Sequence, residues 1–153
     1  MHVSTLSLLS LSALSPLVNA VGNAIVLNEL TAPVYLWSVG SSVGPAQIVP
    51  PGEAYSEPFR VDPSSGGIAI KITATENGLY DGSPQTIFSY SLVNDRVFYD
   101  LSDVYGDAFS GDYVALAPSD PSCPLIVWQN GVPGGGSNVK DCQSEANVTL
   151  NLG

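Results

Sequence analysis

The sequence predicts an all-β domain, folded as an antiparallel sandwich or a flattened barrel, and three observations support this class. Short runs rich in β-branched and aromatic residues alternate apolar and polar side chains with a period of two. Clusters of Gly, Pro, Asn and Asp separate these runs. Helical periodicity is nearly absent, so nothing indicates the alternating strands and helices of a parallel sheet.

Ten strands are predicted from these runs. In the fifth, three isoleucines share one face, and in the sixth Phe88, Tyr90 and Leu92 do so. The stretch 120–136 is rich in Pro and Gly and predicts a long loop. The predicted strands are 24–29, 33–39, 47–49, 54–59, 68–73, 86–92, 97–101, 113–116, 125–128 and 148–152.

The N-terminus is typical of a cleavable export signal. Residues 6–17 are apolar, too few to span a bilayer, and Val18-Asn19-Ala20 places small residues where a signal peptidase reads. We therefore expect a signal peptide over 1–20 and one secreted domain over 21–153. No later stretch is apolar enough to cross a membrane, so we expect no membrane span, and association with the cell wall would be non-covalent.

Two further features fit an oxidising compartment. Cys123 and Cys142 are the only cysteines, and such an even pair predicts a disulfide that staples the Gly-rich loop between them. Asn147-Val148-Thr149 is an N-glycosylation sequon. In an extended segment Asn147 and Thr149 share one face, opposite Val148, which predicts an outward-pointing acceptor.

The net charge and the histidine content limit which partners and which kinds of active site the chain can have. The formal net charge of −10 makes nucleic acid and anionic membranes poor partners, because their phosphates would be repelled. His2 is the only histidine and lies in the predicted signal, so the mature chain lacks a Ser-His-Asp or Cys-His site and the usual ligand of catalytic zinc or copper. We expect a monomer with no cofactor and no metal.

Two sets of residues remain as candidates for a site. Asp100 and Asp103 could approach each other across a turn, as the paired carboxyls of a glycosidase do, although aspartates also simply favour turns and solubilise the surface. The glycan-binding candidates are aromatic residues that could stack on sugar rings, although burial in the core is the more frequent use of such side chains. These candidates are Tyr35, Trp37, Tyr99 and Tyr105.

Several motifs resemble known proteins. Residues 22–28, 33–40 and 97–106 resemble the thaumatin-like proteins. The chain is still more similar to a fungal branch, the secreted antigenic family named for a yeast-phase-specific protein of Blastomyces, over residues 34–41, 66–72, 99–104 and 118–123. The resemblance implies a thaumatin-like antiparallel β-sandwich with one disulfide-stapled loop, in an antigenic or cell-surface protein of a fungus.

The resemblance also bears on activity. Thaumatin-like proteins carry an acidic cleft that is thought to act on β-glucans, and Asp100 matches one of its aspartates. The other acidic positions of the cleft fall on Val97, Tyr105 and Ser89 here. We therefore predict a non-catalytic protein that binds cell-wall polysaccharide or a host molecule, because binding needs no acid and base pair. The alternative is a weak β-glucan hydrolase with an acidic cleft around Asp100.

Overall fold

The fold is described by a computed structural model over residues 20–136 and 138–153. The predicted signal peptide, apart from Ala20, lies outside these residues. Within the described ranges there is no α-helix, and so no helix that is long and apolar enough to cross a membrane.

Eleven strands make up the described chain. Ten of them coincide with the predicted ones to within a few residues, and β10 lies where no strand was expected. The strands are β1 (Asn23–Asn28), β2 (Val34–Val39), β3 (Gln47–Val49), β4 (Ala54–Pro58), β5 (Ile68–Thr73), β6 (Gln85–Val93), β7 (Arg96–Val104), β8 (Val114–Pro118), β9 (Ile126–Trp128), β10 (Lys140–Gln143) and β11 (Val148–Leu152).

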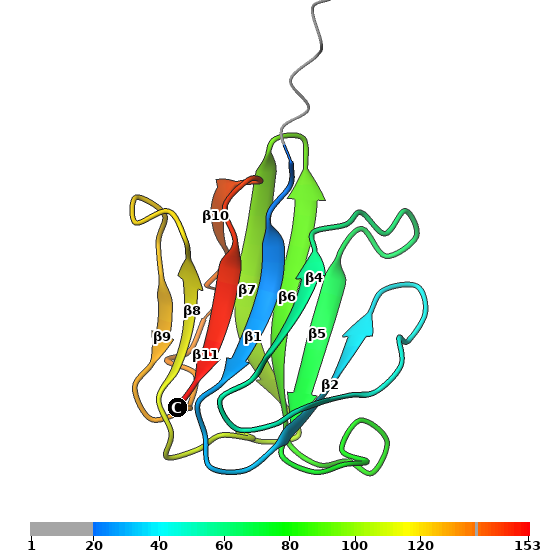
Figure 1. The fold of residues 1–153 in the computed structure, drawn as a ribbon, viewed down its shortest axis with the longest axis vertical. Helices are drawn as coiled ribbons and strands as arrows, with labels where there is room; N and C mark the ends of the chain where they lie inside the picture. The colour runs from blue at the N-terminus through cyan, green and yellow to red at the C-terminus, as the bar shows by residue number, and fades with distance from the viewer. Residues whose placement is uncertain (1–19, 137) are drawn as a thin grey trace, which may run out of the picture.

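The strands form two sheets that pack face to face as a sandwich (Figure 1). The five-stranded sheet has the order β4-β1-β11-β8-β9, and the six-stranded sheet has the order β10-β7-β6-β5-β2-β3. All pairs are antiparallel except β1 and β11, which lie side by side in blue and red in Figure 1 and run parallel. The predicted β-sandwich is therefore confirmed, with one parallel pair in an otherwise antiparallel structure.

The core lies between the sheets and follows the predicted alternation. Ile68, Ile70 and Ile72 on β5 and Phe88 and Tyr90 on β6 all point inward and are at most 2% exposed. On β11 the apolar residues Val148, Leu150 and Leu152 are fully buried, whereas Thr149 and Asn151 between them are partly exposed. Period-two patterning fixes which face is buried, because a shift of one residue would expose the whole apolar set.

The two outer faces of the sandwich differ in composition. The outward positions of the five-stranded sheet carry no charged residue; we call this surface the neutral face, and its members are Asn23, Ile25, Leu27, Ala54, Ser56, Pro58, Ala115, Ala117, Val127, Thr149 and Asn151. The outward positions of the six-stranded sheet, the groove face, include Lys71, Arg96, Asp100 and Asp141. The groove face is also hollowed, and it holds the candidate site.

Candidate functional site

The groove face contains an open groove of about 500 Å³ over strands β5, β6 and β7. Its floor is made of small outward side chains, because Ala69 and Ser89 are cross-strand neighbours on β5 and β6. Ser91 continues the floor along β6. Large neighbours rise around this floor, namely Phe98 on β7 and Val139 just before β10. The hollow thus results from small residues at paired positions of the sheet.

One end of the groove is formed by the loop that precedes β5. Gly66 has a φ of +78°, a conformation that favours glycine. A Cβ atom on Gly67 would lie 2.9 Å from the carbonyl oxygen of Tyr90, so only glycine allows the loop to approach β6 this closely. Asp62 anchors the loop by accepting hydrogen bonds from the backbone N–H groups of Ser41, Ser64 and Ser65 and from the Ser41 hydroxyl, at 2.8–3.0 Å. These bonds hold the pKa of Asp62 well below its usual range.

Asp100 is the one carboxylate among the described residues that line the groove. It lies on β7 directly across from Ser89 and is partly exposed. One of its side-chain oxygens is enclosed and accepts no hydrogen bond from the described residues. An enclosed acceptor without a protein donor costs free energy unless water or a ligand donates to it. Asp100, together with the hydroxyls of Ser89, Ser91 and Ser65, gives the groove its polar groups.

Asp103 does not join Asp100, and the predicted pairing of these two aspartates is wrong. Strand β7 continues to Val104 without a bulge, so residues three apart point to opposite faces of the sheet. Asp103 lies on the inner side and accepts a 2.7 Å hydrogen bond from the Thr86 hydroxyl. Burial and the neighbouring carboxyl of Asp107 raise the pKa of Asp103 to about 6, against the opposing effect of Thr86.

The aromatic candidates do not form a common surface. Trp37 faces outward but is only 3% exposed, and Tyr80 packs edge-on against it with ring centroids 6.2 Å apart. Tyr99 belongs to the core, and its hydroxyl donates to the carbonyl oxygen of Pro124 at 2.5 Å. The idea that Trp37 and Tyr99 stack on sugars is therefore corrected, because their rings are covered. Tyr35 is partly exposed and Tyr105 is 70% exposed, but neither lines the groove.

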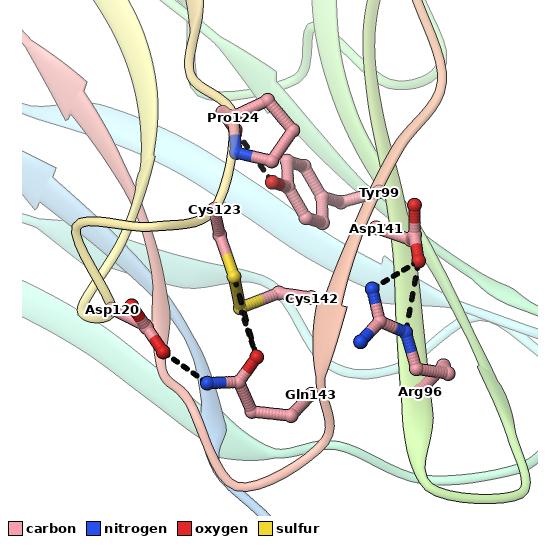
Figure 2. Close-up of polar contacts among 8 residues, drawn as sticks. All are labelled: Arg96, Tyr99, Asp120, Cys123, Pro124, Asp141, Cys142 and Gln143. Carbon is pink, nitrogen blue, oxygen red and sulfur yellow. Dashed lines mark hydrogen bonds and ion pairs between the residues drawn. A yellow bond between two sulfur atoms is a disulfide. The ribbon is translucent and has the colours of Figure 1, made fainter.

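The disulfide holds one wall of the groove. Cys123 and Cys142 are bonded with a Cα–Cα distance of 5.5 Å, which confirms the predicted staple between the loop after β8 and strand β10 (Figure 2). In the same view Arg96 of β7 makes an ion pair with Asp141 of β10, with a 2.8 Å bond from Nε. Val139 immediately precedes β10, so these links to β10 also position the wall that Val139 provides.

A second polar cluster, which sequence reasoning missed, lies at the flank of the sandwich between β4 and β2. Glu57 accepts hydrogen bonds from the hydroxyls of Tyr55 and Tyr90, each at 2.7 Å. Burial and Glu57 raise the pKa of both tyrosines. Arg60 donates to the Ser38 hydroxyl at 3.1 Å beside them. Each of these groups has a partner, so the cluster serves mainly to join the two sheets.

Sequence reasoning also missed most of the groove. Ser65, Ser91 and Val139 carry no motif, and their meeting depends on pairing between strands that are distant in sequence. Ser89 and Phe98 entered only through the resemblance, Ser89 at a position of the acidic cleft and Phe98 within the segment 97–106, and neither was predicted to bind. The outward alternation of β6 and β7 was the available signal. Among the described residues, no group of three or more His, Cys, Asp or Glu side chains could hold a metal ion.

Comparisons with known proteins agree with this architecture. Residues 11–153 match the family model of Bys1, described as Blastomyces yeast-phase-specific protein. An antigenic thaumatin-like protein of Arthroderma benhamiae is 36% identical over 154 residues, which cover 96% of this chain and 73% of the relative. The secreted thaumatin-like protein calA of Emericella nidulans is 33% identical over 147 residues, covering 86% and 81% respectively.

Two solved structures share the fold. The protein elicitor MoHrip2 from Magnaporthe oryzae superimposes with a TM-score of 0.70 and 26% identity, covering 86% of this chain and 98% of that one. The thaumatin-like xylanase inhibitor TLXI superimposes with a TM-score of 0.60 at 13% identity, covering 84% and 97%. Because the family model spans nearly the whole sequence and the sandwich agrees, the chain belongs to the Bys1 family of fungal thaumatin-like proteins.

Proposed function

We propose that this chain is a secreted protein that acts without catalysis, by binding a neutral cell-wall polysaccharide in the groove of the six-stranded sheet. The observation that carries the proposal is the single carboxylate of the groove, Asp100, surrounded by serine hydroxyls and the Phe98 ring. Secretion is supported by the relatives, which are named antigenic and secreted thaumatin-like proteins, and by the disulfide.

The geometry disfavours the alternative, a weak β-glucan hydrolase. Glycoside hydrolysis by the usual route needs two carboxyl groups on either side of the scissile bond. Asp103, the nearest acid along β7, points to the other side of the sheet. Ser89 and Ser91, across the strand from Asp100, can accept and donate hydrogen bonds but cannot replace a titrating acid at neutral pH.

The chemistry of the groove also indicates the kind of ligand. A net charge of −10 disfavours acidic polymers, whereas a neutral glucan or chitin chain meets no repulsion. Its hydroxyls can donate to the enclosed carboxylate oxygen of Asp100 and exchange hydrogen bonds with the serines. The apolar face of a sugar ring can pack against Phe98.

A host protein is the second candidate ligand. It is favoured by the likeness to the solved structure of the protein elicitor MoHrip2. Groove variants should distinguish the two ideas, because a glycan would depend on Asp100 and the floor of the groove, whereas a protein partner would contact a wider surface.

The experiment is retention of the pure protein on insoluble β-glucan and on chitin, with release of reducing sugar measured in parallel. We expect retention without hydrolysis, and roughly tenfold weaker binding for Asp100→Asn, because a charge-assisted hydrogen bond is lost. Asp95→Asn is the matched control. It removes the same charge, but from an exposed turn outside the groove. Retention that is absent or equal in both variants would contradict the proposal, and sugar release that needs Asp100 would restore the hydrolase.

A further inference from the structure

The neutral face poses a question that groove binding leaves open. The chain has fourteen acidic and four basic residues, yet none occupies an outward position on the five strands of this sheet. Instead, the partly exposed side chains of Ile25, Leu27 and Val127 lie among Thr, Asn, Ser and Ala. A neutral occupant of this face would therefore cover no charged side chain of the strands.

The sequon lies at one end of this face. Asn147 immediately precedes β11, the central strand of the five, and Thr149 of the sequon is one of the outward residues. The Asn147 side-chain oxygen accepts hydrogen bonds from the backbone N–H of Asn23 at 2.9 Å and from the Asn23 side-chain amide at 3.2 Å. These bonds fix the amide on the outer side of the sheet.

The side-chain nitrogen of Asn147, Nδ2, takes no part in these bonds and is available for modification. This nitrogen donates no hydrogen bond to the described residues, and Asn147 is partly exposed. A sugar on Nδ2 leaves the amide oxygen in place, so both bonds to Asn23 can persist in a glycosylated chain. The folded structure therefore accommodates a modification that is made on the extended chain before folding.

We propose that Asn147 carries an N-linked glycan that lies over the neutral face and leaves the groove face free for ligand. In the transfer, Nδ2 loses a proton and bonds to the anomeric carbon of a lipid-linked oligosaccharide of the secretory pathway. The bond from that carbon to the donor's pyrophosphate breaks, and the lipid pyrophosphate leaves.

The composition of the face suits this occupant. A glycan that lies along it dehydrates no charged side chain, which is the largest cost of covering a protein surface. Sugar hydroxyls find partners in the side chains of Asn151 and Ser56, and ring faces find Ile25 and Leu27. The groove face, with its exposed ion pair and enclosed carboxylate, is a much poorer surface for a permanent cover.

The first test asks whether the glycan exists. The full chain is secreted from a eukaryotic host as Thr149→Ser, which keeps the sequon, and as Thr149→Ala, which removes it without altering Asn147. We expect digestion with an amidase that cleaves N-glycans to lower the mass of the wild type and of Thr149→Ser, and to leave Thr149→Ala unchanged. Equal masses before and after digestion of the wild type would overturn the proposal.

The second test asks what the glycan covers. Ser56→Cys places a thiol on the neutral face, and Ser91→Cys places one in the groove. We expect a bulky maleimide to label the thiol at position 56 several-fold faster in the Thr149→Ala background than in the Thr149→Ser background, with no difference at position 91. Equal labelling rates at position 56 in the two backgrounds, in a chain shown to be glycosylated, would refute the proposal that the glycan covers the neutral face. The intact mass of each cysteine variant serves as the control that the native disulfide has formed.

Discussion

The groove face and the neutral face are built from the same kind of strand, yet they differ in relief and in charge. The groove exists because Ala69 and Ser89 are paired small residues beside the larger Phe98, and because Gly67 lets a loop approach the sheet. The outward positions of the neutral face carry no charge, and the one charged residue of its strands, Glu57, lies on the inner side of β4. The two faces therefore present different surfaces to a ligand, while the inward positions of both sheets maintain the sandwich.

The largest effect is expected when the disulfide is removed, because it ties the edge strand β10 of the groove face to the loop between β8 and β9. The pair Cys123→Ala and Cys142→Ala should lower the free energy of unfolding by about 3 kcal/mol, because the open loop gains entropy in the unfolded chain. Strand β10 pairs only with β7, so hydrogen exchange should rise in β10 first. Urea denaturation and amide exchange measure the two effects.

The control for the disulfide variant is Ser122→Ala, which changes the same loop and keeps the bond. If β1 and β11 lost protection as early as β10, the expectation that β10 opens first would be wrong.

Filling the groove should abolish binding without harming the fold. Ala69→Leu places a large side chain on the floor and should weaken retention on polysaccharide at least about tenfold, or about 1.4 kcal/mol. Ala117→Leu makes the same change at a partly exposed position of the neutral face and should bind normally. Binding isotherms on the insoluble polymer check both variants, and equal loss in the two would place the binding site elsewhere.

The smallest expected effect concerns Asp103, the inward aspartate of the groove-face strand β7. The pKa of Asp103 is raised to about 6 in the fold, so between pH 4 and 6 the folded state binds more protons than the unfolded state. Stability should therefore fall as the pH rises through this window, by about 1 kcal/mol, because the group is only half-buried and solvent screens it.

Urea denaturation from pH 4 to pH 7 measures this slope. Asp103→Asn should flatten it, because the group whose pKa is raised by burial is then absent. Below about pH 4 the trend reverses, because Asp62, Asp81 and Asp120 have lowered pKa values and lose stabilising hydrogen bonds when they are protonated. If the slope persisted in Asp103→Asn, the dependence of stability on pH would have to come from other groups.

The inward faces could be predicted because alternation is a local signal. The apolar faces of β5, β6 and β11 were identified from period-two patterning, whereas the buried polar residues Thr73, Gln85 and Thr86 were not. Strand β10 was missed because Lys140–Gln143 is polar in sequence, and it becomes a strand only through pairing with β7 and the bond from Cys142. Tertiary contacts here override local propensity.

The candidate site was harder to predict from the sequence, because it depends on contacts between segments that are distant in the chain. Alternation shows that Tyr35 and Trp37 share a face, but it does not show that Tyr80 from a distant loop covers Trp37. Asp100 and Asp103 were separated by the length of β7, which continues past the point where a turn was expected. The groove depends on the register of three strands, which no single segment encodes.

The parallel pairing of β1 with β11 has a consequence for how the chain matures. Strand β11 is inserted between β1 and β8, so without it the five-stranded sheet divides into the pairs β4-β1 and β8-β9. The sheet can close only after the ribosome has added residues 148–152, and until then two strand edges stay unpaired. Pairing between strands so distant in sequence is slow. The chain therefore depends most on chaperones between the end of synthesis and the closure of this sheet.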